Sequence, residues 1–212
     1  MLCLLNNFVS PHNDIVLDLQ SNQAYLLIQK CGTQTLLHLT RVKPSRFVVI
    51  SSEEFLQTGI DTLTVFVREP IKRYISGICT QMKIYGINQH VFENLLNVRN
   101  TVPVFDTHTM PQFWFLLRFG IDSTLKFKIV ELSSLANLTD TTLNQSSDVK
   151  LNISDQALSK IDYAMTDDIV LYNQFLNKTV TLPEIIDCIS DETDYCNENK
   201  KYKNIFPYLR DI

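Results

Sequence analysis

The sequence predicts an α/β protein in which helices cover both faces of a central parallel sheet. Short apolar runs suited to buried strands alternate with longer segments of helical periodicity. The expected strands are residues 24–28, 46–50, 63–67 and 125–132. Expected helices follow the first three runs and occupy residues 88–99, 110–119 and the segment that starts near Asp155 behind the capping residue Ser154. Because strands that alternate with helices pair in parallel, this order defines the fold class.

Composition fits one domain over residues 1–212, since 45% hydrophobic and 20% charged residues are ordinary for a globular chain. The net charge of −4 argues against a nucleic-acid partner. Five cysteines without a CxxC pair favour a reduced, cytoplasmic setting. We expect no membrane segment and no signal peptide, and four N-x-[ST] sequons make a Golgi-lumen location the less favoured alternative.

The segment 25–39, YLLIQKCGTQTLLHL, reads as a strand, a small-residue turn and a helix. A helix that starts there directs its unpaired N–H groups and the positive end of its dipole at the space over the turn. Lys30 adds a cation, while Thr33 and Thr35 add hydroxyls. The lysine precedes Gly32 and the chain has no GxxxxGK[ST] motif, so an ordinary NTPase is disfavoured.

A second strand-to-helix turn follows residues 63–67, where Arg68 stands at the strand end and Glu69-Pro70 opens a helix. Ile71, Tyr74, Ile75, Ile78, Met82 and Tyr85 predict an apolar stripe that packs against the sheet, with Lys72, Arg73, Ser76 and Thr80 outside it. Arg68 and Ser76 can then point into the crevice above the strand ends. Two anion-binding turns on neighbouring strands indicate a ligand with phosphates at both ends.

These turns resemble two motifs of the sulfotransferases. The sequence QKCGTQTLLHL (29–39) looks like their 5′-phosphosulfate-binding loop, and VREPIKRYISG (67–77) is similar to their 3′-phosphate motif RDPxxRxxSxxxx. DTHTMPQ (106–112) is similar to the D-x-H-x-x-P-Q segment of carbohydrate sulfotransferases, and IDYAMTDDIVLYNQF (161–175) to their Y-x-x-D-x-x-x-Y helix. The four motifs occur in family order and cover roughly residues 24–176.

The resemblance implies a P-loop-like three-layer sandwich and transfer of a sulfuryl group from 3′-phosphoadenosine-5′-phosphosulfate (PAPS) to an acceptor hydroxyl, foremost on a carbohydrate. It implies no metal. The implied donor-binding residues are Lys30, Cys31, Gly32, Thr33, Gln34, Thr35, Arg68, Arg73 and Ser76.

Sulfuryl transfer needs a general base near the acceptor and cations near the leaving phosphate. Lys30 suits the second task. His108 is our candidate base, because an imidazole titrates near neutral pH, with a purely orienting role as its alternative. Glu53 and Glu54 are the rival bases. Cys31 is more readily explained as a small residue that fits the loop than as a nucleophile.

Two other functions stay open: a P-loop-like phosphotransferase that uses ATP, and a nucleotide-binding module that has lost catalysis. The second is suggested by Gln34 and Glu69, which depart from the family pattern. Residues 135–154 are rich in Thr, Asn, Ser and Asp and predict a polar loop or lid. Residues 187–212 predict a polar tail with an apolar patch at 205–209.

Overall fold

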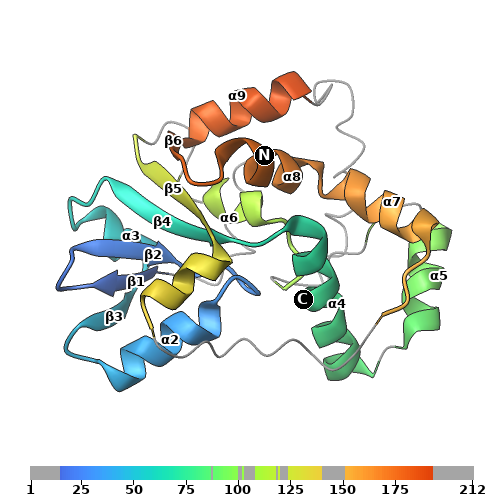
Figure 1. The fold of residues 1–212 in the computed structure, drawn as a ribbon, viewed down its shortest axis with the longest axis horizontal. Helices are drawn as coiled ribbons and strands as arrows, with labels where there is room; N and C mark the ends of the chain where they lie inside the picture. The colour runs from blue at the N-terminus through green and yellow to red at the C-terminus, as the bar shows by residue number, and fades with distance from the viewer. Residues whose placement is uncertain are drawn as a thin grey trace.

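A six-stranded mixed sheet forms the centre of the computed structural model, which describes residues 15–86, 88–99, 102, 108–117, 119, 124–139 and 151–192 (Figure 1). The strands are β1 Ile15–Asp18, β2 Gln23–Leu26, β3 Phe47–Ile50, β4 Thr62–Val67, β5 Lys126–Glu131 and β6 Thr179–Thr181. Their order across the sheet is β3-β1-β2-β4-β5-β6. The strands predicted at 24–28, 46–50, 63–67 and 125–132 are thus confirmed within two residues, and β1 and β6 are additional.

Only the centre of the sheet is parallel. β4 pairs in parallel with both β2 and β5, whereas β1 is antiparallel to β2 and β3, and β6 is antiparallel to β5. The prediction of a parallel sheet therefore holds for the pairing of β2, β4 and β5 and is wrong for the pairings of β1, β3 and β6. A physical reason is the connection between β1 and β2, because residues 19–22 are too few for a parallel crossover.

Helices follow most of the strands. They are α2 Thr33–Val42, α3 Ser52–Leu56, α4 Pro70–Tyr85, α5 Gln89–Arg99, α6 Gln112–Leu117, the 3-10 helix η1 Leu132–Asn137, α7 Asp155–Ala164, α8 Thr166–Phe175 and α9 Leu182–Glu192. The expected helices at 88–99 and 110–119 correspond to α5 and α6, and Ser154 caps α7 through the Ala157 N–H as predicted. No described helix is long and apolar enough to span a bilayer.

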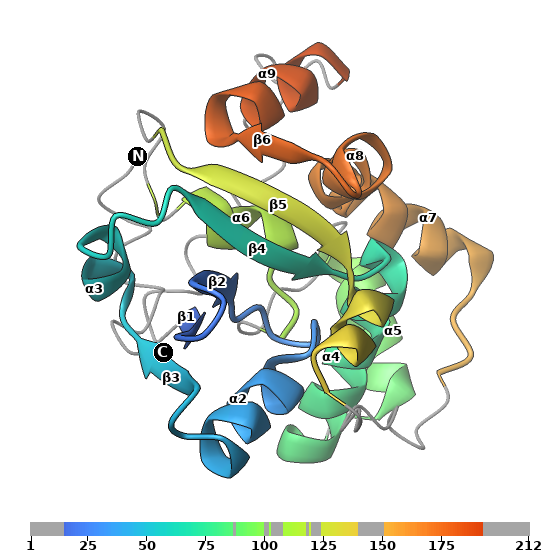
Figure 2. The ribbon, with the colours of Figure 1, turned by 60° about the vertical axis from the view of Figure 1, so that its left-hand side comes forward.

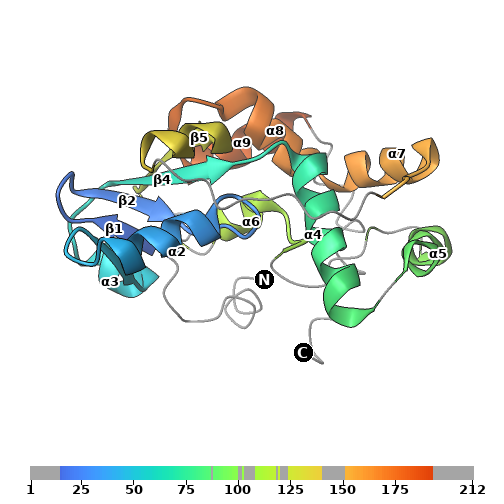
Figure 3. The same cartoon turned by 60° about the horizontal axis from the view of Figure 1, so that its bottom comes forward.

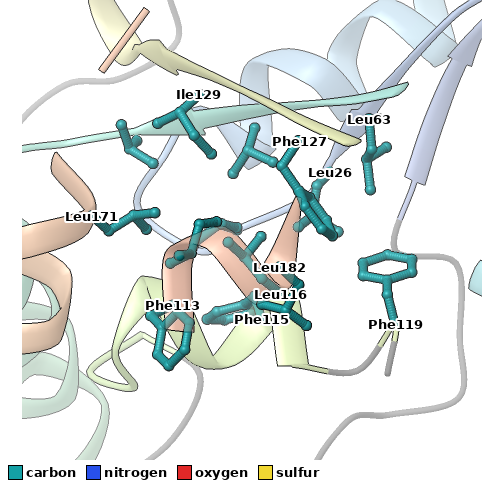
Figure 4. Packing of buried hydrophobic residues seen from close by; sticks show 14 of the residues in the cluster. Leu26, Leu63, Phe113, Phe115, Leu116, Phe119, Phe127, Ile129, Leu171 and Leu182 are labelled. Atoms are coloured by element: carbon teal, nitrogen blue, oxygen red, sulfur yellow. The ribbon is translucent and has the colours of Figure 1, made fainter. Parts of the chain in front are cut away.

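Both faces of the sheet are covered by helices, as expected. Successive side chains of a strand point to opposite faces, and here the side chains on both faces are buried. On one face α6, α8 and α9 pack on the strands, as Figure 4 shows for Leu116 and Leu182 in one cluster with Phe127 and Leu26 of the sheet. On the other face α2 and η1 cover Tyr25 and Phe66, whose rings stack with centroids 5.9 Å apart. Figure 2 shows α2 and the pair α8 and α9 on opposite sides of the sheet. The fold is thus an open α/β arrangement.

Helix α4 leaves the sheet rather than packing along it (Figure 3). Tyr74 and Ile78 lie in a third apolar cluster with side chains of α5 and α7, including Phe92 and Ile161. The predicted stripe is therefore buried against helices, and Tyr85 at its end is 64% exposed. The prediction that this stripe packs on the sheet is wrong.

Two predicted polar segments are partly replaced by helix. The start of the proposed lid at 135–154 belongs to η1, and Leu135 is buried. The start of the proposed tail at 187–212 belongs to α9, whose Ile185 and Ile189 pack in the core. Residues 140–150 and 193–212 lie outside the described residues, and the apolar patch at 205–209 is among them.

Candidate donor-binding site

Two strand-to-helix turns lie side by side at the carboxyl ends of β2 and β4. These strands are parallel neighbours with Leu26 opposite Val65, so the chain after β2 runs beside the end of β4. The first turn leads into α2 and the second into α4 (Figure 2). Carboxyl ends of adjacent parallel strands are where open α/β sheets bind ligands. The predicted 5′ and 3′ phosphate motifs therefore lie next to each other.

The first turn is held by hydrogen bonds to one carbonyl group. Ile28 O accepts the Cys31 N–H at 3.0 Å and the Thr33 hydroxyl at 2.7 Å. Lys30 and Gly32 have positive φ angles of 66° and 86°, which curl the chain tightly before α2. The Thr33 hydroxyl hydrogen is thus directed back into the turn. Any contact of Thr33 with an anion would come from its backbone N–H.

Helix α2 begins without a side-chain cap. Gly32 is its N-cap residue, and no side chain in the described part of the chain caps the helix start. The first N–H groups of a ten-residue helix are therefore directed at the space over the turn. Gln34 is exposed, whereas Thr35 is fully buried. The helix end thus offers backbone donors rather than a hydroxyl from Thr35.

Gly32 also allows η1 to approach the turn. A Cβ atom at Gly32 would overlap the Leu135 side chain and come within 3.0 Å of Leu132. Combined with the positive φ angle, this contact makes glycine the residue that fits this position. Helix η1 thereby supports the first turn from below.

Cys31 is buried, and its thiol donates a hydrogen bond to Gln112 Oε1 at 3.0 Å. Burial raises the pKa of this thiol to about 11, although the nearby cations Arg73 and Arg68 oppose the shift. The thiol is therefore neutral at physiological pH, and a neutral buried thiol is a poor nucleophile. The geometry gives Cys31 a role in holding the turn.

The second turn presents Arg68 at the end of β4. Among the described residues, its guanidinium makes no hydrogen bond or ion pair, and the side chain is only partly buried. Glu69 caps α4 by accepting the N–H groups of Ile71 and Lys72, at 3.1 and 2.8 Å. Glutamate thus serves here as the cap before Pro70. Arg68 is positioned as an available cation, and Ser76 lies partly exposed two turns into the same helix.

Arg73 lies in the interior, in contrast to its predicted place outside the buried side of α4. Its side chain is 0% exposed. Its Nε donates to Gln29 O at 3.0 Å, and its guanidinium also donates to Met110 O. The guanidinium carbon lies 5.8 Å from the Phe115 ring centroid, within the range of a cation–π contact. Arg73 thus fastens the first turn and the segment before α6 to α4.

Gln112 and Asp168 were not among the predicted site residues, yet both lie directly beneath the two turns. The Gln112 side-chain amide accepts the Arg68 N–H at 2.9 Å and donates to Arg68 O at 3.0 Å. Asp168 accepts the N–H groups of Gln112 and Phe113 at 2.7 and 2.8 Å. The available sequence signal was their position in the family-like segments 106–112 and 161–175.

The carboxyl group of Asp168 is fully buried, and this burial raises its pKa. The nearby Arg73 and the backbone N–H groups of Phe113 and Gln112 act in the opposite direction. Every hydrogen bond described for Asp168 is one that it accepts. Asp168 thus holds the backbone at the start of α6, and Arg73 is close enough to act on its pKa.

His108 lies against α4 beside the candidate 3′ site. A Cβ atom at Gly77 would overlap the carbonyl oxygen of His108, so the two backbones are in direct contact. Gly77 follows Ser76, which brings His108 to the same helix turn as a predicted phosphate ligand. The His108 side chain is partly exposed. Asp106, the neighbouring acid in the motif, lies outside the described residues.

Glu53 and Glu54 are not brought together with these residues. They lie on α3, which precedes β4, whereas the candidate site follows β4, and a six-residue strand spans about 20 Å. The three views agree that α3 and α4 lie at opposite ends of β4 (Figures 1–3). The Glu54 carboxylate also accepts the Ser51 N–H at 2.7 Å in a capping box. His108, in contrast, touches Gly77 of α4, the helix that follows Arg68.

A hollow of about 380 Å³ lies at the opposite end of the sheet and is separate from this site. Its lining includes Gln23, Asp61, Thr62 and Lys128, at the amino ends of β2 and β4 and along β5. The described residues contain no cluster of three or more metal-ligating side chains.

No protein-family model, no curated protein and no solved structure matches the chain. Function is therefore inferred from the residues of the chain itself.

Proposed function

We propose that the protein is a sulfotransferase that moves a sulfuryl group from PAPS to an acceptor hydroxyl. One observation carries the proposal: two strand-to-helix turns adjoin on parallel strands, and they offer different groups to an anion. The turn before α2 offers backbone donors and Lys30, while the turn before α4 offers the guanidinium of Arg68, which has no partner among the described residues. A nucleotide with phosphates on both its 5′ and 3′ positions matches this pair.

In the proposed complex the uncapped start of α2 and Lys30 contact the 5′-phosphosulfate. Arg68 and Ser76 contact the 3′-phosphate, and Arg68 can do so through two parallel N–H bonds. Arg73 is not a direct ligand in this arrangement, because its side chain is 0% exposed and bonded to backbone carbonyls. It acts from beneath by holding the first turn. Cys31 likewise acts from beneath.

The proposed reaction is a single displacement at sulfur. The acceptor oxygen forms a bond to sulfur as the bond between sulfur and the bridging phosphate oxygen breaks. The acceptor proton passes to His108, and negative charge on the departing 3′-phosphoadenosine-5′-phosphate is offset by Lys30. The step needs no oxidant, reductant or metal.

The finer parts of the proposal follow from the same motifs. The open α/β fold would be the P-loop-like three-layer version, and the acceptor would be a carbohydrate hydroxyl, which the segment 106–112 suggests. A cytoplasmic location is proposed from the odd cysteine count, and Cys31, Cys79 and Cys188 are free thiols in the structure.

Calorimetry with three nucleotides tests the donor. We expect 3′-phosphoadenosine-5′-phosphate to bind about 10- to 100-fold more tightly than AMP, because the extra phosphate adds a charge-assisted contact. Equal affinities would contradict the proposal. Tighter binding of ATP with Mg²⁺ would support the phosphotransferase instead. Selective binding of the 3′-phosphate without transfer of labelled sulfate to any glycan would identify a module that has lost catalysis.

A further inference from the structure

Gln112 makes an unusual contact with the candidate site, because its side chain pairs with the backbone of Arg68. The amide oxygen accepts the Arg68 N–H at 2.9 Å, and the amide nitrogen donates to Arg68 O at 3.0 Å. The side chain is 0% exposed. Both polar groups of one backbone residue are thus satisfied by a single buried side chain.

The contact begins where the sheet ends. Val67 is the last residue of β4 and still pairs with Glu131 of β5, whereas Arg68 lies beyond the strand. A residue just past a strand would ordinarily pair its backbone with water or a turn. Here the Gln112 amide takes the place of a neighbouring strand and holds both polar groups of the Arg68 backbone. The direction in which the Arg68 side chain leaves the sheet is thereby fixed.

Gln112 is itself held firmly. Its backbone N–H donates to Asp168 Oδ2 at 2.7 Å, and its Nε2 lies 3.4 Å from the same oxygen. Its amide oxygen also accepts the Cys31 thiol hydrogen at 3.0 Å. The same side chain therefore touches the backbone of the Arg68 turn and the thiol of the Lys30 turn. It is the shared support of the two phosphate motifs.

We infer that Gln112 is a positioning residue that aims Arg68 at the 3′-phosphate of the donor nucleotide. The inference rests on the proposed function, since it assumes that Arg68 contacts this phosphate. Selectivity for the 3′-phosphate would then depend on Gln112, a side chain that does not contact the ligand.

The test replaces Gln112 with methionine, which keeps the length of the side chain and removes both hydrogen bonds to Arg68. We expect the ratio of the AMP and 3′-phosphoadenosine-5′-phosphate dissociation constants to fall about tenfold, because small displacements of a positioned group are costly. In an Arg68→Ala background the same replacement should leave the ratio unchanged. That non-additivity would show that Gln112 acts through Arg68.

Gln81→Met is the matched control, because Gln81 is another buried glutamine, 1% exposed, further along α4. It should lower stability without changing the ratio. Amide hydrogen exchange gives a readout that needs no ligand: in Gln112→Met the Arg68 N–H should exchange about tenfold faster or more, while the N–H groups of Val65 and Phe66 keep their protection. If Gln112→Met does not fold, Gln112→Glu serves instead, since its carboxylate keeps the acceptor for the Arg68 N–H and loses the donor.

The outcomes separate the two proposals. A wild-type chain that binds both nucleotides equally overturns the donor proposal and this inference together. Selectivity in the wild type that survives in the Gln112 variant overturns this inference alone. Unchanged exchange of the Arg68 N–H also overturns it. Loss of selectivity in both the Gln112 and the Gln81 variants would mean that general destabilisation, rather than positioning, is the cause.

Discussion

Gly77 lies directly against the carbonyl group of His108, so that a Cβ atom at position 77 would overlap its oxygen and carbon atoms. A backbone carbonyl group cannot swing aside as a long side chain can. The contact sets how closely the segment containing the candidate base approaches the helix containing Ser76.

Gly77→Ala should therefore displace His108. We expect a loss of about 1–3 kcal/mol in unfolding free energy, as for other overpacked sites, and turnover reduced about 10- to 100-fold by misplacement of the base. Urea denaturation and a sulfate-transfer assay measure the two effects. Gly86→Asn is the control, since nothing lies within 4 Å of a Cβ there and asparagine tolerates the positive φ angle of 64°. Wild-type stability in Gly77→Ala would contradict the described contact.

Arg68→Ala should weaken donor binding and leave the stability of the fold unchanged. Loss of a charge-assisted phosphate contact costs about 1.5–3 kcal/mol, or about one to two orders of magnitude in the dissociation constant. Stability should be unchanged, because within the described residues the guanidinium has no partner to lose. Calorimetry and thermal melting check the two statements. Lys72→Ala, an exposed cation on α4, is the control for general charge effects.

Arg73→Met, unlike Arg68→Ala, should lower the stability of the fold. It removes the buried cation beside Asp168 and frees the carbonyls of Gln29 and Met110. Leaving a buried carbonyl group without its donor costs about 1–3 kcal/mol for each group, so we expect a lowered melting temperature. Arg73→Lys should recover only part of this, since one ammonium cannot reproduce the fork of the guanidinium. An Arg73→Met protein of normal stability that has lost donor affinity would return Arg73 to the role of a phosphate ligand.

Lys30→Ala and His108→Ala should separate binding from catalysis. We expect Lys30→Ala to lose donor affinity and turnover together, because in the proposed complex the ammonium contacts the 5′ group in both the ground state and the transition state. His108→Ala should keep donor affinity and lose about 10²- to 10⁴-fold in turnover. Glu53→Ala and Glu54→Ala serve as controls from the distant helix α3. An inactive glutamate variant with intact binding, beside an active His108→Ala, would assign the base to that glutamate.

The ion pair of Asp18 and Arg46 should make the unfolding free energy fall at acid pH. Arg46 donates to both carboxylate oxygens, at 3.0 and 2.7 Å, and these bonds hold the pKa of Asp18 at about 2. An unfolded aspartate titrates near 3.9. The folded pKa is the lower one, so the contribution is complete above about pH 4 and is lost as the pH falls toward about 2.

Asp18→Asn should accordingly lose about 1–2 kcal/mol at pH 7, a range that allows for solvent screening of the partly exposed Arg46. The difference from wild type should shrink as the pH falls from 4 to about 2. Urea denaturation across this range measures it. Asp61→Asn is the control, because its ion pair with Lys126 is exposed on both sides. A pH-independent difference would mean that Asp18 acts by packing alone.

The parts of the fold with a local signal were predictable. Runs of β-branched residues marked β3 and β4, Pro70 marked the start of α4, and Ser154 marked α7. The strand β6 has three residues, too few for a periodic pattern to appear. The direction of β1 depends on its pairing with β2 and β3, which no local pattern specifies.

The candidate site, like the fold, has parts with a local sequence signal and parts without one. Motif spacing placed Lys30 and Arg68 on neighbouring turns, and the structure brings those turns together. The burial of Arg73 could not be read from the helix pattern, because its partners lie on two other segments. The roles of Gln112 and Asp168 likewise arise from contacts between residues 44 to 56 positions apart. Long-range hydrogen bonds of this kind have no signature within a single window of sequence.

The mixed pairing of the sheet also has a consequence for folding. β1, β2 and β3 pair within residues 15–50 and β4 joins β2 by residue 67, whereas the pairing of β4 with β5 needs the chain from Lys126 onward. Pairing across a long separation carries a larger entropic cost of loop closure, and contacts of this kind tend to form late. The hydrogen bonds that hold the Arg68 backbone come from Gln112 on α6, which is held in turn by Asp168 on α8. Both helices belong to the later part of the chain. We therefore expect the donor site to be absent from the folding transition state, so that a bound nucleotide slows unfolding and leaves the folding rate almost unchanged.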